Sequence, residues 1–253
     1  MKKKNFLFFP ILFVMGIGLF SCNFGNTGNV SNYVNTPAVA TFDMNLGMVL
    51  GTPYGYMAAP ELTNINDGDC IYMQQFTIDY NNQPSSQYTT ATNIVETGVG
   101  QSYLEMRNDS VGVAGYTLPF SNVGVVGSSP FFQGKLFLGM TCPDNNPALR
   151  LVYNSNDTVI NGAVNLYLLA KPSSTTPSTT SSDILYAFDL SYFIQSVAGR
   201  DTTVAVSGTS GTYSLRYIQA NIKYLTGISA DGVTPIYTDV LQNPYIVAVF
   251  NNY

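Results

Sequence analysis

Histidine and tryptophan are absent from the 253-residue sequence, and charged side chains make up only 10% of it. Without histidine the chain lacks the commonest general base, and with it the Ser-His-Asp and Cys-His nucleophile systems. Every zinc or non-haem iron site that uses a histidine ligand is excluded as well. Most hydrolase chemistries are therefore excluded by composition.

Positive charge is also scarce, because 10 lysines and arginines stand against 15 aspartates and glutamates. Three of the lysines, Lys2, Lys3 and Lys4, lie in a segment that we expect to be removed. The remaining chain then carries a net charge of about −8, since the whole chain carries −5. Such a charge opposes contact with a phosphate backbone, so we expect no nucleic-acid partner.

The N-terminus has the pattern of a secretory signal. The basic Lys2–Lys4 precede an apolar run from Phe6 to Phe20, which is too short to favour a spanning helix. Leu19-Phe20-Ser21-Cys22 resembles a bacterial lipobox, in which the cysteine is acylated and becomes the new N-terminus. We expect residues 1–21 to be a signal peptide and Cys22 to carry fatty acids such as palmitate. The alternative is an uncleaved membrane anchor with an incidental cysteine.

Residues 22–37 are rich in Asn, Gly, Ser and Thr, which is typical of a flexible tether. Two acyl chains give a stable anchor, so the prediction is a protein held by lipid on the outer membrane. The sequence leaves open whether it faces the periplasm or the cell surface.

After the tether the apolar residues follow period two, which predicts β-strands separated by turn residues such as Asp67-Gly68 and Asp231-Gly232. The expected strands are Gln87–Val95, Leu136–Thr141, Ala148–Tyr153, Ala163–Ala170, Thr202–Val206, Tyr213–Tyr224 and Tyr245–Phe250, with further β-rich residues from Ala38 to Leu50. Many short strands with regular turns indicate an all-β protein built as a barrel or sandwich.

The clearest strand is Cys70–Tyr80, where Cys70, Tyr72, Phe76, Ile78 and Tyr80 are expected on one buried face.

One segment has helical spacing: Leu190, Phe193, Ile194 and Val197, with Asp189 as N-cap and Gly199 past the end. The preceding Ser173–Ser182 is expected to be a solvated loop.

Three landmarks resemble the NigD-like lipoprotein family of Bacteroidetes: the Asn66–Cys70 turn that precedes a strand, Asn108-Asp109-Ser110, and Ala187-Phe188-Asp189-Leu190-Ser191. The resemblance implies an N-terminal small OB-type barrel followed by a C-terminal β-sandwich. With the polar break near Asp109 and Gly112, we predict a barrel over 38–112 and a sandwich over 113–253. The resemblance implies little about activity, beyond an association of the family's founding member with bacteriocin production.

Candidate catalytic and metal-binding residues are few. Asp67 and Asp69 flank Gly68, but Ile65 stands where a calcium loop would need an oxygen ligand, which favours a turn. The three glutamates, Glu61, Glu96 and Glu105, show no pairing of the kind that glycosidases need. We expect no metal, no cofactor and no enzymatic activity.

Two cysteines remain after lipidation, Cys70 and Cys142. A disulfide between them would stabilise the fold by about 4 kcal/mol, but it would have to cross the predicted domain boundary. Two separately buried thiols are the favoured alternative.

Tyr54 and Tyr56 flank Gly55 in a loop-like stretch and are the candidate ligand-contact aromatics. The competing interpretation is an edge strand that packs on its own barrel.

Ser110, Thr158 and Thr202 each follow an aspartate and precede Val or Thr. These triplets resemble the acceptor pattern of the general O-glycosylation system of Bacteroidetes, while Asp-initiated turns would explain them equally well.

The function expected from these features is that of a non-enzymatic accessory lipoprotein that binds another protein or component of the cell envelope. The alternative is a surface lipoprotein that binds polysaccharide through the barrel or the sandwich, and this rests on fold analogy.

Overall fold

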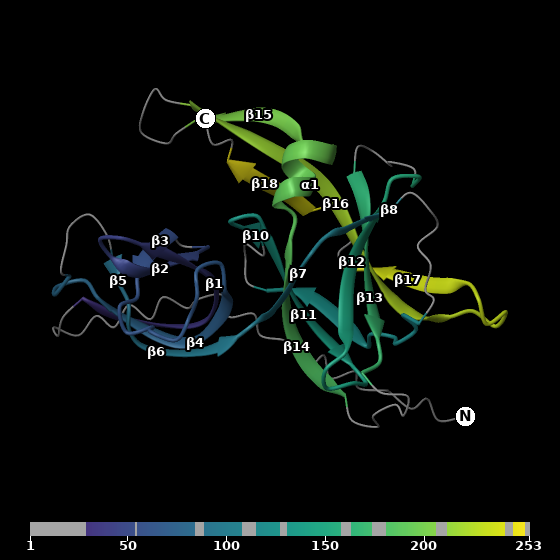
Figure 1. Ribbon diagram of the computed structural model, residues 1–253, viewed down its shortest axis with the longest axis horizontal. Coiled ribbons are helices and arrows are strands. Elements are labelled where there is room, and N and C mark those ends of the chain that lie inside the picture. Colours follow the sequence, from purple (N-terminus) through teal and green to yellow (C-terminus); the bar gives the residue numbers. More distant parts are fainter. Residues whose placement is uncertain are drawn as a thin grey trace, which may run out of the picture.

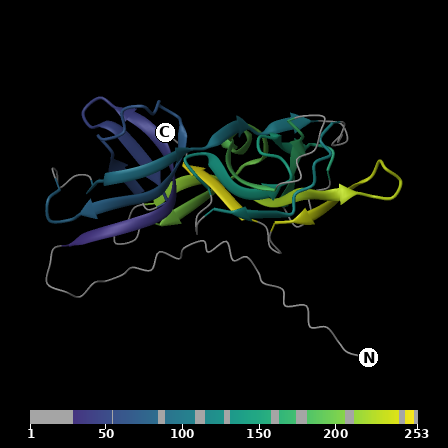
Figure 2. The same cartoon turned by 90° about the horizontal axis from the view of Figure 1, so that it is seen from below.

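The computed structural model describes residues 29–53, 55–83, 89–107, 115–126, 131–157, 163–173, 181–205, 212–240 and 245–250. Strands account for nearly all of the regular structure, which confirms the all-β prediction. The N-terminal strands form one body and the later strands a second body beside it (Figures 1 and 2).

The N-terminal body is a small closed barrel. Its strands are β1 (Val30–Asp43), β2 (Gly47–Thr52), β3 (Gly55–Ala58), β4 (Cys70–Asp79), β5 (Thr89–Thr90) and β6 (Thr92–Gly98). They are ordered β5-β3-β2-β1-β4-β6, and only Ala91 separates β5 from β6. This last segment pairs parallel with β3 and then antiparallel with β4, so the sheet closes on itself. The result is the small barrel of OB type that the sequence analysis predicts.

The predicted tether extends too far along the chain, because β1 begins at Val30. Residues 30–37 pair with residues 72–79 of β4, and this ladder satisfies their backbone groups. Their polar composition reflects an exposed strand face, on which Asn32 and Asn35 lie, and not a flexible segment. The β-rich residues from Ala38 to Leu50 are a hairpin whose two strands, β1 and β2, meet at Met44–Leu46.

The expected single buried face of β4 is also wrong. Ile71 and Met73 face the barrel core together with Phe76 and Ile78, whereas Cys70 lies on the opposite face. The change of phase occurs where the β4–β6 pairing shifts register around Gln75. Such an irregularity exchanges the two faces of a strand, which a strict period of two does not anticipate.

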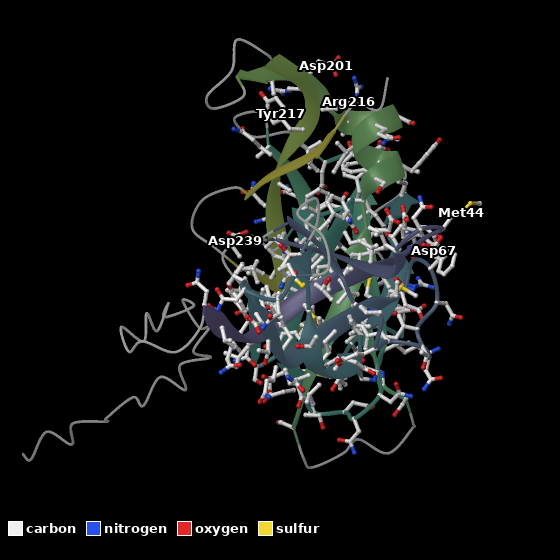
Figure 3. The ribbon with its side chains drawn as sticks, turned by 90° about the vertical axis from the view of Figure 1, so that its left-hand side faces the viewer. Met44, Asp67, Asp201, Arg216, Tyr217 and Asp239 are labelled. Carbon is white, nitrogen blue, oxygen red and sulfur yellow. The ribbon has the colours of Figure 1, made fainter. Side chains whose placement is uncertain are left out.

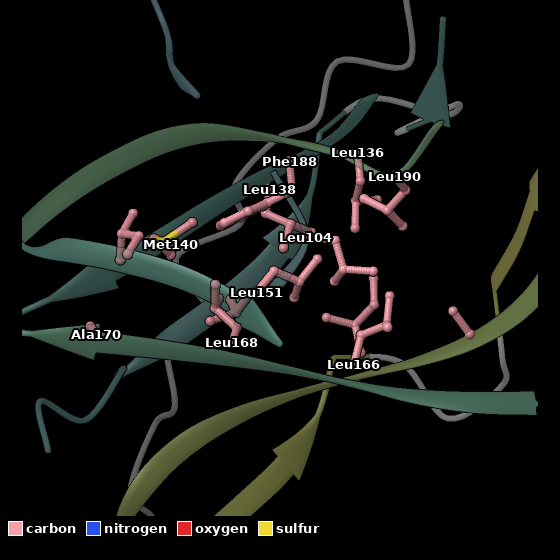
Figure 4. Close-up of a cluster of buried hydrophobic side chains, with 14 of the residues drawn as sticks. Leu104, Leu136, Leu138, Met140, Leu151, Leu166, Leu168, Ala170, Phe188 and Leu190 are labelled. Atoms are coloured by element: carbon pink, nitrogen blue, oxygen red, sulfur yellow. The ribbon is translucent and has the colours of Figure 1, made fainter. Parts of the chain in front are cut away.

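The second body is a two-sheet sandwich. One sheet contains β7 (Gly100–Tyr103), β9 (Asn122–Val125), β10 (Phe131–Phe132), β11 (Lys135–Cys142) and β14 (Ser182–Asp189). The other contains β8 (Glu105–Arg107), β12 (Ala148–Asn154), β13 (Ala163–Lys171), β15 (Arg200–Ala205), β16 (Thr212–Ile228), β17 (Pro235–Asp239) and β18 (Tyr245–Phe250). Leucines from both sheets, including Leu138 and Leu166, are fully buried between them (Figure 4).

The boundary between barrel and sandwich lies earlier than residue 112. Strand β7 pairs with β14 and β8 pairs with β12, so residues 100–107 belong to the two sandwich sheets. Leu104 stands between these two short strands and is buried in the sandwich core. The polar break at 109–112 therefore follows two strands of the second body, and the chain passes between the bodies at Gly98–Gly100.

The predicted helix is present as a short α1 (Ser191–Phe193) that continues into a π-helical turn, η1 (Ile194–Ala198). Phe193 and Ile194 are buried, but Val197 is exposed because a π turn rotates later residues away from the 3.6-residue spacing. The Asp189 carboxylate accepts the Ser191 N–H at 2.8 Å, although Leu190 holds the N-cap position. Gly199 follows the last helical residue, as predicted, and its backbone is extended.

A third apolar cluster joins the two bodies. From the barrel it contains Val39 and Cys70, and from the sandwich Phe137 and Ala187. The outer faces of β1 and β4 thus pack on the β11–β14 sheet. Among the described residues, no helix is both long and apolar enough to cross a membrane.

Candidate functional site

One of the two aromatic residues singled out in the sequence, Tyr56, lies on the barrel surface. Tyr54 lies outside the described residues, while Tyr56 is 68% exposed at the start of β3 and pairs with Gly51 of β2. The amide of Gln133 occupies the space next to Gly51 that a Cβ would need, so a side chain at position 51 would have to displace it. OB-type barrels bind oligosaccharides and oligonucleotides on the face of their second and third strands. In this chain the turn between β10 and β11 covers part of that face.

The two cysteines are free and lie in different apolar clusters. Cys142 is in the sandwich core, and Cys70 is between the two bodies, where its Sγ donates to Oε1 of Gln101 at 3.1 Å. Burial raises the pKa of the Cys70 thiol to about 11 and also raises that of Cys142. The structure thus contains two buried thiols and no Cys70–Cys142 disulfide.

The glutamates lie on separate elements. Glu61 is exposed in the loop after β3, and Glu96 is exposed on β6. Glu105 forms ion pairs with Arg107 at 2.7 Å and Arg150 at 3.3 Å. No group of three or more potential metal ligands occurs in the part of the chain that the structure describes.

The landmark Phe188-Asp189-Leu190 has a structural place in the sandwich. Phe188 and Leu190 are fully buried in its core. The Asp189 carboxylate pairs with Lys135 at 3.3 Å on the neighbouring strand, in addition to its bond with Ser191. These residues fix the junction between β14 and α1, so the landmark has a structural role in the fold.

A small pocket of about 190 Å³ lies where η1 meets the β13–β16 sheet, and residues such as Tyr153 and Arg200 line it. Pockets that hold ligands usually enclose about 300–1,000 Å³. This one is too small to hold a ligand of ordinary size.

The most exposed apolar side chain of the barrel, Met44, lies at one end of it, which we call the barrel tip. The barrel tip comprises residues 42–47 of the β1–β2 hairpin and the loop 59–69. Met44 is 95% exposed and Phe42 62% exposed. The Asp43 carboxylate accepts the N–H groups of Asn45 at 2.8 Å and Leu46 at 3.0 Å, and Gly47 has a φ of +73°. Together these features fix the turn that carries Met44.

The second half of the barrel tip is tied to β1. The Phe42 N–H donates to Oδ1 of Asp67 at 2.9 Å, which places Met44 and Asp67 at the same edge of the barrel (Figure 3). Gly68, with a φ of +86°, donates its N–H to the Ala40 carbonyl, and Ala40 donates to the carbonyl of Asp69. The turn predicted at Asp67-Gly68 is therefore confirmed.

Carboxylates share the barrel tip with the apolar pair Met44 and Phe42. Asp43, Glu61, Asp67 and Asp69 all belong to it, whereas no lysine or arginine occurs in the sequence between Lys4 and Arg107. The barrel thus has no basic side chain of its own. The β-rich sequence over Ala38–Leu50 does not reveal the exposed turn of the barrel tip, although Asp43 and Gly47 are typical residues of a hairpin turn.

Of the four predicted modification sites, the structure describes one. Cys22, Ser110 and Thr158 lie outside the described residues, and Thr202 is exposed on β15. Asp201, which precedes it, is bound by the Arg216 guanidinium at 3.1 Å.

No protein-family model matches the sequence, and no curated protein is significantly similar to it. Nine solved chains match the structure. An uncharacterised protein from Parabacteroides merdae is 13% identical, with a TM-score of 0.60 over 87% of this chain and 100% of its own. A candidate lipoprotein from Bacteroides fragilis is 14% identical, with a TM-score of 0.53 over 86% of this chain and 97% of its own.

The chain shares its two-body β-fold with these two proteins. The matches also include a NigD-like immunity protein from Bacteroides caccae, from the family that the sequence landmarks resemble. It is 15% identical, with a TM-score of 0.44 over 85% of this chain and 93% of its own.

Proposed function

We propose that the protein is a non-enzymatic lipoprotein of the outer membrane that binds another protein of the cell envelope. The observation that carries the proposal is the N-terminal pattern, with Lys2–Lys4, the apolar run Phe6–Phe20 and Cys22 in a lipobox-like sequence. The likeness to a candidate lipoprotein from Bacteroides fragilis supports the same conclusion. Acylation of Cys22 would anchor the chain stably.

Binding of a protein partner is supported by large apolar side chains that the fold leaves exposed. Met44 is 95% exposed, Tyr103 80% and Phe42 62%. Apolar residues that contribute little to a core and stay in contact with water are a feature of interaction surfaces. The apolar cluster between the bodies holds these surfaces on a common framework.

Binding of polysaccharide is a second candidate function, and the exposed Tyr56 favours it, because a tyrosine ring can stack on a sugar. Against it stands Gln133, which covers the neighbouring Gly51 on the face that OB-type barrels use.

Anchoring and binding can be tested separately. Labelled fatty acid should be incorporated into the wild-type protein and not into Cys22→Ala, and unchanged labelling of the variant would contradict the lipoprotein proposal. Isolation of the acylated protein from solubilised outer membrane should then yield a stoichiometric protein partner. A glycan-array signal that Tyr56→Ala abolishes, without such a partner, would instead support polysaccharide binding.

A further inference from the structure

We propose that the barrel tip is the docking surface of this protein, and that its partner is an envelope protein with an apolar pocket bordered by lysines or arginines. This inference rests on the proposed function and specifies the surface that performs it.

The apolar part of the barrel tip has the features of a binding anchor. Met44 and Phe42 are separated by one residue and expose 95% and 62% of their surface, while the neighbouring Met48 is buried in the barrel. Burying a methionine or phenylalanine side chain contributes favourable free energy to binding. The fold leaves most of this free energy unused, so it is available to a partner.

The turn is held in shape before binding. Two N–H groups donate to the Asp43 carboxylate and the Phe42 N–H donates to Asp67. Gly47 supplies the left-handed backbone that closes the hairpin. Binding of a partner would therefore order little of the backbone of this turn, so little binding free energy is lost as conformational entropy.

Charge selects the kind of partner. Four carboxylates lie on the barrel tip, and the sequence has no basic residue between Lys4 and Arg107. Anionic lipid headgroups and nucleic acid would be repelled, and so would the barrel tip of a second copy. A partner with basic side chains around its pocket complements this surface.

The position of the barrel tip relative to the lipid anchor fits a protein partner. Only residues 23–28 separate Cys22 from the described chain, and they span at most about 25 Å. The anchor precedes the N-terminal end of the 14-residue β1, whereas Met44 follows its C-terminal end. The barrel tip is therefore at the end of β1 remote from the anchor, where a neighbouring protein can reach it.

A photoreactive amino acid at position 44 of the full acylated chain, expressed in the native host, tests the proposal. The matched control carries the same group at Val233, which is 73% exposed on the β16–β17 turn. That turn is also fixed by an aspartate, since Val233 donates its N–H to Asp231 at 2.9 Å. We expect one protein adduct from position 44, absent from position 233, in which the cross-linked region of the partner contains Lys or Arg.

Charge reversal gives an independent measurement. Glu61→Lys changes the barrel tip without breaking any of the bonds that shape it, and Glu96→Lys makes the same change on exposed β6 of the same barrel. We expect Glu61→Lys to reduce adduct formation from position 44 about tenfold, and both Glu61→Lys and Met44→Asp to reduce partner recovery about tenfold. Glu96→Lys and Val233→Asp should leave both unchanged. Circular dichroism melts of each variant verify that it folds.

The proposal is overturned if positions 44 and 233 form the same adducts, or if position 44 forms none. It is also overturned if the adduct is lipid or glycan, or if Glu61→Lys and Glu96→Lys behave alike. A partner that Met44→Asp recovers as well as the wild type would refute the docking surface and leave the proposed function standing. Failure of the wild type to recover any partner would refute both.

Discussion

At the scale of single residues, aspartate serves this chain mainly as a turn residue. Asp43, Asp67 and Asp231 each accept main-chain N–H groups, and Asp231 binds those of Val233 and Thr234 at 2.9 Å. Hydrogen bonds from the Ser229 and Thr234 hydroxyls, followed by these main-chain bonds, hold the pKa of Asp231 well below its usual range. Residue type alone predicts such turns, since they need only local geometry.

The buried thiol of Cys70 gives a pH-dependent stability. Its pKa rises from 9.0 to about 11 mainly because burial disfavours the thiolate. Between these values the folded chain keeps a proton that the unfolded chain releases, so the free energy of unfolding falls as pH rises. From pH 8 to pH 10 the Tm of the wild type should fall about 3 °C more than that of Cys70→Ala, as measured by circular dichroism. Parallel decreases in the two proteins would contradict the assignment.

Thr202 is the O-glycosylation candidate that the structure describes. It is exposed on β15, and Arg216 binds the preceding Asp201, so a glycan on the hydroxyl would displace no core contact. Protein from the native host should carry glycan mass at Thr202, Ser110 and Thr158. The intact mass of Thr202→Ala should be lower by the mass of one glycan. Protein from a host without this modification is the control. An intact mass that acyl chains explain completely would rule the modification out.

At the scale of elements, sequence periodicity locates strands better than it orients them. Strand β4 begins at the predicted residue, Cys70, and ends at Asp79, one residue before the prediction. Its faces exchange near Gln75, and Asn35 on the adjacent β1 has a φ of +54°. Both irregularities depend on pairing between distant segments, which local sequence does not encode. The barrel tip was missed for a similar reason, because alternation over Ala38–Leu50 hides the turn at Met44.

The orientation of β4 can be measured by a pair of truncations. Ile71 is 2% exposed in the barrel core, whereas Gln75 is exposed at the change of phase. Ile71→Ala should lower the free energy of unfolding by about 2–5 kcal/mol, because it leaves a cavity. Gln75→Ala should change it by less than about 0.5 kcal/mol. Denaturant titration of the two variants checks this, and similar losses in both would mean that the faces are assigned wrongly.

At the scale of the whole molecule, the resemblance predicts the order of barrel and sandwich but not their contact. Val39 and Cys70 look like core residues of the barrel in sequence, yet they pack against Phe137 and Ala187 of the sandwich. An apolar residue on a strand gives no sign of which of two bodies it faces. The predicted domain boundary follows the polar break near Gly112. In the structure the boundary lies earlier, at residues 98–100.

The boundary determines which fragment of the chain folds independently. A fragment of residues 29–98 retains every strand of the barrel, including the ladder between Val30–Val39 and β4. A fragment of residues 38–112 loses the first part of that ladder and retains β7 and β8, whose partners β14 and β12 are absent from it. The 29–98 fragment should therefore show a β-type circular dichroism spectrum with a cooperative melt, and the 38–112 fragment should not.

The same fragments report on the contact between the bodies. Fragment 29–98 should melt below the full chain, because its Val39, Cys70 and Tyr72 lose their apolar partners in the sandwich. In the full chain, Phe137→Ala removes one of those partners and should lower the free energy of unfolding by about 3–5 kcal/mol. A cooperative melt of fragment 38–112 at the temperature of fragment 29–98 would contradict this boundary. It would show that residues 30–37 contribute nothing to the barrel, contrary to their pairing with β4.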